Sequence, residues 1–161
     1  MRAVLQRVGS ASVSVAGQTV GQLPPGAGLL VYVGIAADDS ADNAAKLAEK
    51  VANLRIFEDD DGRLNLSVLD VGGGVLVVPN FTLQADTRKG RRPAFVNAAP
   101  GQQARPLHEA FIEALESQGV PVRQGRFGAE MRIVSEAIGP VNVIVDIPAG
   151  AGGAGRQDSA H

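Results

Sequence analysis

The segment Leu76–Pro93, which reads LVVPNFTLQADTRKGRRP, is the most informative part of this chain. It begins as an apolar run typical of a buried strand, passes through a short polar turn, and ends in four cations, Arg88, Lys89, Arg91 and Arg92. Charged runs are often only solvated surface. The Thr, Gly and Pro residues around these cations instead favour a loop that presents side chains and N–H groups to phosphates.

The segments on either side predict a mixed α/β domain. Several short runs either alternate apolar and polar residues or are apolar throughout, as strands do. We expect strands over residues 4–8, 11–15, 18–23, 29–35, 75–78, 131–135 and 141–147. Two helices against this many strands indicate an α/β fold with a largely antiparallel, barrel-like sheet and two main helices.

The two helices are predicted from apolar residues at helical spacing. The sequence Asp-Asp-Ser at 38–40 offers capping side chains before an apolar stripe over residues 44–54. A second stripe covers residues 107–115, and Pro106 is expected in the first turn of that helix. His108 lies beside this stripe, where a surface position is the ordinary expectation.

Composition excludes several classes of protein. The 161 residues carry a formal net charge of -2 and contain no Cys, which excludes a nucleic-acid coating protein and thiolate chemistry. We expect one domain over residues 1–147 and a disordered Gly- and Ala-rich tail over 148–161. No signal peptide or membrane-length apolar run is recognised, so the expectation is a cytoplasmic protein with no membrane partner.

Familiar catalytic and metal-binding patterns do not emerge from the sequence. Thr82 stands at a strand end, but an activated hydroxyl needs a base within reach, and the histidines His108 and His161 offer a poor one. The segment Glu58–Gly62 resembles a calcium loop, yet Phe57 occupies its first ligand position, so a solvated turn is favoured. We expect no metal and no cofactor, and an enzyme that relies on backbone groups and positioning.

Gly139-Pro140 separates the last two expected strands. By itself the dipeptide indicates a plain turn. A cis Pro peptide at this point would instead hold the neighbouring carbonyl groups in a fixed direction. Rigid carbonyl acceptors are suited to distinguishing the handedness of a small amine.

Six blocks of the sequence resemble the D-aminoacyl-tRNA deacylases, also called D-tyrosyl-tRNA deacylases, in order and spacing. They are MRAVLQRV (1–8), NLRIFEDDDGRLNLSVLDVGG (53–73), LVVPNFTLQADTRKGRRP (76–93), FIEAL (111–115), GRFGAEM (125–131) and GPV (139–141). The resemblance covers residues 1–147. It implies a homodimeric, cytoplasmic proofreading hydrolase that acts on aminoacylated tRNA, cleaving the ester to a D-amino acid or to glycine mischarged on tRNA-Ala.

The resemblance also implies how the ester is cleaved. Asn80, Phe81 and Thr82 match the motif that lines the scissile ester with backbone N–H groups and a Thr hydroxyl. Two mechanisms are considered for such proteins, with either the Thr hydroxyl or the terminal ribose 2′-hydroxyl of the tRNA as the catalytic group. Because the chain offers no evident base for Thr82, the ribose hydroxyl is favoured.

A second set of residues is assigned to substrate binding by the same resemblance. Gly139 and Pro140 match a Gly-cisPro motif that enters the partner subunit's active site, holds the substrate amino group and excludes an L side chain. Arg7 matches an arginine that supports this motif, and Phe127 and Met131 match pocket-lining positions. The loop that carries Arg88, Lys89, Arg91 and Arg92, called the basic loop below, is then expected to hold the tRNA.

Four motif positions depart from the family pattern. Pro79 stands in place of Ser, Asn80 in place of Gln, Ala137 in place of Asn and Asn142 in place of Thr. A related branch that removes L-alanine from mischarged tRNA also begins this motif with Pro. An L-alanine-specific deacylase and a non-catalytic RNA-binding relative are therefore the alternatives.

Overall fold

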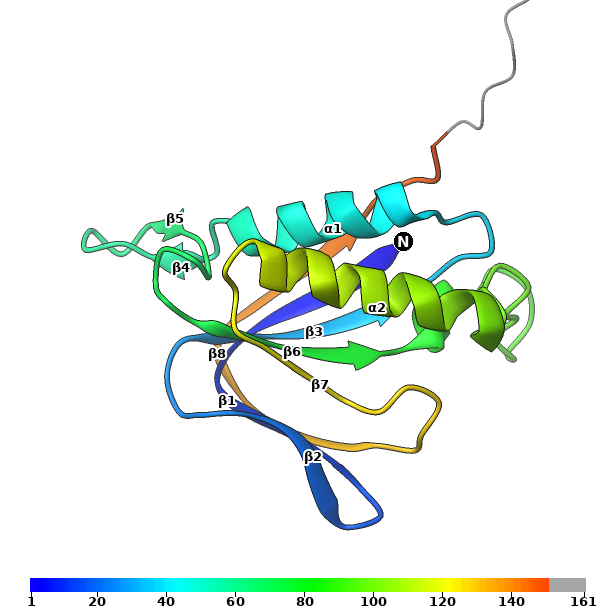
Figure 1. Ribbon diagram of the computed structural model, residues 1–161, viewed down its shortest axis with the longest axis horizontal. Helices are drawn as coiled ribbons and strands as arrows, with labels where there is room; N and C mark the ends of the chain where they lie inside the picture. The colour runs from blue at the N-terminus through cyan, green and yellow to red at the C-terminus, as the bar shows by residue number, and fades with distance from the viewer. Residues whose placement is uncertain (151–161) are drawn as a thin grey trace, which may run out of the picture.

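The computed structural model describes residues 1–150 and is built around a six-stranded sheet (Figure 1). The strand order is β2-β1-β3-β6-β7, and β8 pairs with β1. These strands are β1 (Arg2–Val15), β2 (Gln18–Leu23), β3 (Gly28–Gly34), β6 (Gly74–Pro79), β7 (Val122–Gln124) and β8 (Arg132–Asp146). The remaining elements are helices α1 (Ala41–Asn53) and α2 (Gly101–Ser117), a 3-10 turn η1 (Phe81–Gln84), and a separate pair, β4 (Phe57–Glu58) and β5 (Leu64–Leu66).

The two longest strands organise the sheet. The first half of β1 pairs with β3 and its second half pairs with β2, while β8 runs antiparallel along nearly all of β1. Register shifts on either side of Val8 absorb the irregularity of this ladder, as β-bulges do. The predicted strands 4–8 and 11–15 are therefore one strand. The strands predicted on either side of Gly139-Pro140 are likewise joined into one.

The fold class is confirmed, with antiparallel and parallel pairs in one sheet. β1 pairs antiparallel with each of its partners, whereas β3-β6 and β6-β7 are parallel. β3 is buried along almost its whole length, as its unbroken apolar run predicts. The sheet curls until β2 meets β7: a Cβ added to Gly21 would lie 2.5 Å from the carbonyl oxygen of Gln124. This close approach nearly closes the barrel.

The two helices lie side by side across one face of the sheet (Figure 1). Leu47 from α1, Phe111 and Leu115 from α2, and Leu5 and Leu29 from the sheet have no exposed surface. Burying each such side chain contributes about 1.5–3 kcal/mol. Helix α1 begins after Ser40 as predicted, where the Ser40 N–H donates to the Asn43 side-chain oxygen at 3.0 Å.

Two expectations about α2 are wrong. Pro106 lies inside the helix, because α2 begins at Gly101 and not just before the Pro. His108 is not at the surface. Its relative exposure is only 2%, because the segment after the helix returns and places Phe127 against it. The apolar stripe alone did not reveal this second layer of cover.

The turn at residues 58–62 is confirmed as a structural turn. The Asp59 carboxylate accepts from the N–H groups of Asp61 and Arg63 and from the Asn65 side chain, each at 3.0 Å. These donors, the Arg63 N–H foremost, lower the pKa of Asp59. The carboxylate thus closes the hairpin between β4 and β5.

The two ends of the described chain meet beside α1. The Met1 ammonium group donates to Asp39 and to the Ile147 carbonyl oxygen, and the Asn43 side chain donates to the Pro148 carbonyl oxygen at 2.8 Å. Most of the predicted tail, residues 151–161, lies outside the described residues. Among residues 1–150, no helix combines the length and apolar character needed to cross a membrane.

Candidate functional site

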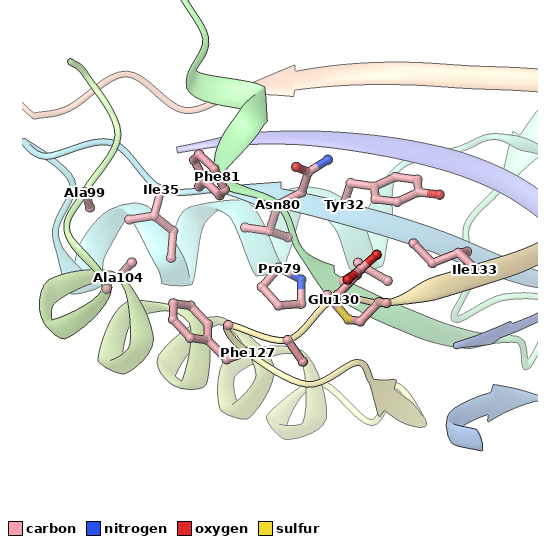
Figure 2. Close-up of a pocket in the computed structure, with 16 residues that line it drawn as sticks. Tyr32, Ile35, Pro79, Asn80, Phe81, Ala99, Ala104, Phe127, Glu130 and Ile133 are labelled. Carbon is pink, nitrogen blue, oxygen red and sulfur yellow. The ribbon is translucent and has the colours of Figure 1, made fainter. Parts of the chain in front are cut away.

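A cavity of about 690 Å³ opens where β6 ends, between η1, the start of α2 and the segment that leads into β8 (Figure 2). Pro79, Asn80 and Phe81 form one side of it, and Phe127 and Met131 form part of the other. Four residues selected from the sequence, Asn80, Phe81, Phe127 and Met131, are therefore brought together here. They come from chain segments about 50 residues apart, joined in space by the parallel packing of β6 and β7.

Asn80 shapes the turn that carries the expected catalytic motif. Its side-chain oxygen accepts from the Thr82 N–H at 3.2 Å and also from the Thr82 hydroxyl. An amide oxygen cannot take up a proton at neutral pH, so it orients this hydroxyl without activating it. Thr82 itself is exposed and is not among the residues that line the cavity.

Phe81 lines this cavity and keeps its backbone N–H. The neighbouring Asn80 N–H donates to the Val33 carbonyl oxygen at 2.8 Å, which anchors the turn to β3. Within residues 1–150 the Phe81 N–H has no backbone acceptor outside regular elements. Pro79, which replaces the expected Ser, lacks an N–H but leaves that of Phe81 intact.

Phe127 forms a rigid wall because two side chains of α2 hold its ring. The Arg105 guanidinium lies 4.9 Å from the ring centroid, and the His108 ring centroid lies 5.8 Å away. Neither ring nitrogen of His108 has a partner within the described residues. Burial, and then the charge of Arg105, lower the pKa of His108 to about 4, so its imidazole is neutral at pH 7.

Two polar residues of the cavity were not singled out from the sequence. Tyr32 contributes from β3, and burial raises the pKa of its phenol. Glu130 contributes a carboxylate from the segment before β8. Nothing in the local pattern distinguishes Tyr32 from the apolar strand around it. Glu130 stands within the GRFGAEM block, which only the resemblance marked.

Arg7 is buried beneath the Gly139-Pro140 corner. Its guanidinium donates to the carbonyl oxygens of Ile138 and Ile56 and to the Glu58 carboxylate, each at 3.2 Å. Gly139 has φ +122°, and a Cβ there would lie 2.9 Å from Val141 and 3.0 Å from the Arg7 guanidinium. The position therefore requires glycine.

The Gly139-Pro140 peptide bond is cis, and the corner is exposed. Gly139, Pro140 and Arg7 are not among the residues that line the cavity of the same chain. The single chain thus presents two separate features: a cavity at the end of β6, and a rigid corner on β8.

The basic loop is pinned at its base. Asp86 and Ala94 exchange backbone hydrogen bonds of 2.7 and 2.9 Å, and the Asp86 carboxylate accepts from the Arg88 side chain at 2.9 and 2.6 Å. The Arg88 side chain is the main cause of a lowered pKa at Asp86. Arg88 is therefore partly neutralised. Lys89, Arg91 and Arg92 are exposed and form no ion pair within residues 1–150.

Comparison with known proteins connects these features to one family. Residues 4–146 match the family model described as D-Tyr-tRNA(Tyr) deacylase. The D-aminoacyl-tRNA deacylase of Chloroflexus aurantiacus is 53% identical over 146 residues, covering 91% of this chain and 90% of that protein. The D-aminoacyl-tRNA deacylase of Thermus aquaticus is 53% identical over 146 residues, covering 91% and 95%.

Two solved structures resemble this chain in fold. A structure described as c-Myc DNA Unwinding Element Binding Protein superposes with a TM-score of 0.86 at 37% identity, covering 92% of this chain and 100% of that one. A probable eukaryotic D-amino acid tRNA deacylase has a TM-score of 0.79 at 19% identity, covering 91% and 98%. The second likeness concerns the fold alone.

Proposed function

The chain belongs to the D-Tyr-tRNA(Tyr) deacylase family, and on this premise we propose how it acts as a tRNA-editing esterase. It is a hydrolase that cleaves the ester bond between a D-amino acid and tRNA, releasing both. The observation that carries this function is the match over residues 4–146, which includes both the cavity at the end of β6 and the corner on β8. Its site of action is the cytoplasm, where aminoacylated tRNA is made and used.

The ester is cleaved without an enzyme nucleophile. Water, assisted by the 2′-hydroxyl of the terminal ribose, forms a bond to the ester carbonyl carbon and loses a proton. The bond between that carbon and the ribose oxygen breaks, and the ribose oxygen takes up the proton. The Phe81 N–H, which has no backbone acceptor in the described chain outside regular elements, stabilises the negative charge that develops on the carbonyl oxygen. The contact between Asn80 and Thr82 supports this mechanism, because it orients the turn and leaves the hydroxyl without a base.

Selection of the D-amino acid is assigned to Gly139 and Pro140. Their carbonyl groups hold the substrate amino group, and their rigid backbone leaves no room for an L side chain. Arg7 supports this role by donating to the Ile138 carbonyl oxygen directly before the corner, at 3.2 Å. Since glycine has no side chain on either face, the same selection admits glycine mischarged on tRNA-Ala.

A homodimer brings the corner of one subunit to the cavity of the other. This arrangement is supported by the absence of Gly139 and Pro140 from the cavity lining of their own chain, and by the surface of β8. β8 pairs with β1 alone among the described strands, and Val134, Ile138 and Ile144 on it are 63%, 42% and 66% exposed. An exposed edge strand with apolar side chains is a usual place for a partner to bind.

Incubation with charged tRNAs tests the function directly. The purified protein is mixed with D-Tyr-tRNA, L-Tyr-tRNA, Gly-tRNA-Ala and L-Ala-tRNA, and ester loss is followed against buffer. Rapid loss from D-Tyr-tRNA and Gly-tRNA-Ala, with L-Tyr-tRNA spared, is expected. Loss from L-Ala-tRNA alone would instead identify the L-alanine-specific branch, and no loss above buffer would identify a binding module. The 53% identity to D-aminoacyl-tRNA deacylases favours the first result.

A further inference from the structure

An aromatic pair lies on the surface between the cavity and the basic loop. The Phe81 and Phe95 rings are 5.1 Å apart in an edge-to-face arrangement, with 64° between their planes. Phe81 is 60% exposed and Phe95 is 37% exposed, and the adjacent Val96 is 80% exposed. Large apolar side chains gathered at one exposed place are unusual on a protein surface and indicate a binding partner.

The basic loop holds Phe95 in a fixed position. Phe95 directly follows Ala94, whose backbone is joined to Asp86 in both directions. The Arg88 side chain also donates to the Asp86 carboxylate, which adds a second link at the base of the loop. The aromatic ring is thus presented from a pinned hairpin, which lowers the entropic cost of using it in binding.

Charge around the aromatic pair identifies the occupant. Lys89, Arg91 and Arg92 lie in the loop that ends at Phe95, are exposed, and form no ion pair within the described residues. Unpaired cations are unfavourable at the centre of a contact between two copies of one chain. Aromatic faces interleaved with cations are instead the usual site for single-stranded nucleic acid, where bases stack and phosphates pair with Arg and Lys.

The aromatic pair is also continuous with the cavity. Phe81 lines the cavity and contacts Phe95, while Ala99, four residues beyond Phe95, lines it as well. A strand of nucleic acid whose last nucleotide enters the cavity would therefore pass over Phe95 before it reaches the basic loop. A tRNA ends in such an unpaired strand.

We propose that Phe95, with Phe81 and Val96 beside it, is a stacking platform for the unpaired nucleotide that precedes the esterified one, while Lys89, Arg91 and Arg92 hold its phosphates. This assignment rests on the proposed function and adds a binding subsite to it. Stacking is tolerant of base identity, so the platform serves any tRNA that carries the common single-stranded end.

The test uses the full chain and a tRNA whose penultimate cytidine is replaced by a fluorescent cytidine analogue that is quenched on stacking. Phe95→Leu removes the ring at a half-exposed position, Phe95→Tyr keeps it, and Leu64→Ala is the matched control because Leu64 is an exposed apolar residue of β5, outside the aromatic pair. Steady-state deacylation of the D-aminoacyl form gives KM and kcat separately.

For Phe95→Leu we expect KM to rise about 5- to 100-fold with kcat nearly unchanged, and the quenching to be lost, whereas Phe95→Tyr and Leu64→Ala behave as the parent. An unchanged KM and unchanged quenching in Phe95→Leu would overturn the platform, as would equal losses in Phe95→Tyr. If the parent quenches the fluorophore in a ring-dependent way but hydrolyses no ester, the platform stands and the proposed function fails.

Discussion

The side-chain oxygen of Asn80 accepts hydrogen bonds from both the N–H and the hydroxyl of Thr82. The two residues therefore act as one unit in which the amide fixes the turn and the hydroxyl is held. This relationship separates two roles that the sequence alone left together, namely shaping the site and attacking the substrate.

Thr82→Ala is expected to retain deacylation within about tenfold of the parent kcat/KM. Removing a true nucleophile costs about a million-fold in a covalent protease. The comparison is made with D-Tyr-tRNA in single-turnover assays, with Thr82→Ser as the control that keeps the hydroxyl. Complete loss in a folded Thr82→Ala protein that still binds tRNA would show that the hydroxyl reacts.

Asn80→Ala is expected to lower both stability and kcat more than Thr82→Ala does. It removes the cap of the η1 turn, which lowers the free energy of unfolding by about 0.5–2 kcal/mol. Because the turn carries the Phe81 N–H, kcat falls as well. Asn80→Asp keeps an acceptor oxygen and should retain the turn, so urea unfolding of the two variants distinguishes loss of the cap from loss of the amide.

Gly139→Ala is expected to destabilise the corner and to change selectivity. At φ +122° with Val141 at 2.9 Å, an added methyl group must displace its neighbours. The left-handed conformation alone costs about 1–2 kcal/mol for a residue with a Cβ. Gly17→Ala is the matched control, because Gly17 has φ +80° with open space around it. The ratio of D-Tyr-tRNA to L-Tyr-tRNA hydrolysis should fall only in Gly139→Ala.

His108 makes stability depend on pH in the acid range. Its folded pKa, lowered to about 4, is below the ordinary 6.5, so the unfolded chain binds the proton first as pH falls. Stability contributed by the neutral imidazole is present above pH 6.5 and is lost between about 6.5 and 4, to a total of up to about 3 kcal/mol. His108→Leu should flatten that part of the pH profile in urea titrations while remaining as stable as the parent at pH 7.

The cations of the basic loop are expected to contribute unequally to tRNA binding. Each phosphate contact made to a single strand contributes about 0.7 to the slope of log K against log salt. Arg91→Ala and Arg92→Ala should each reduce that slope, whereas Arg88→Ala should change it less because Asp86 already pairs with Arg88. Chiral preference should be the same in all three. An equal slope for Arg91→Ala and the parent would exclude a phosphate contact at that residue.

Local pattern was sufficient wherever neighbours in the sequence decide structure. The unbroken apolar run of β3 and the helix start at Ser40 both follow from local chemistry. Patterns of this kind could not show that β1 is continuous, because its continuity depends on a partner strand more than 100 residues later. Burial of His108 was missed because Phe127, which covers it, comes from a segment beyond the helix.

The candidate site divides in the same way. Asn80, Phe81, Phe127 and Met131 were selected through a family resemblance, and the fold brings them to one cavity. Tyr32 was missed because its strand is apolar. Its place in the cavity becomes evident only when the fold brings the end of β6 beside it. Phe95 was missed because an aromatic residue after a basic run does not indicate a binding site by itself. Its exposure and its contact with Phe81 become known only from the structure.

The long ladder between β1 and β8 also determines when the sheet can finish folding during synthesis. Arg2 lies opposite Asp146 and Ser14 lies opposite Arg132, so these pairs join residues more than 100 positions apart. Contacts between such distant residues slow folding, because a large loop must close before they form. During synthesis β1 therefore cannot pair with β8 until the end of the described chain has been made. The corner at Gly139 arrives with that last strand, so an unfinished chain has the cavity residues without the element assigned to selectivity.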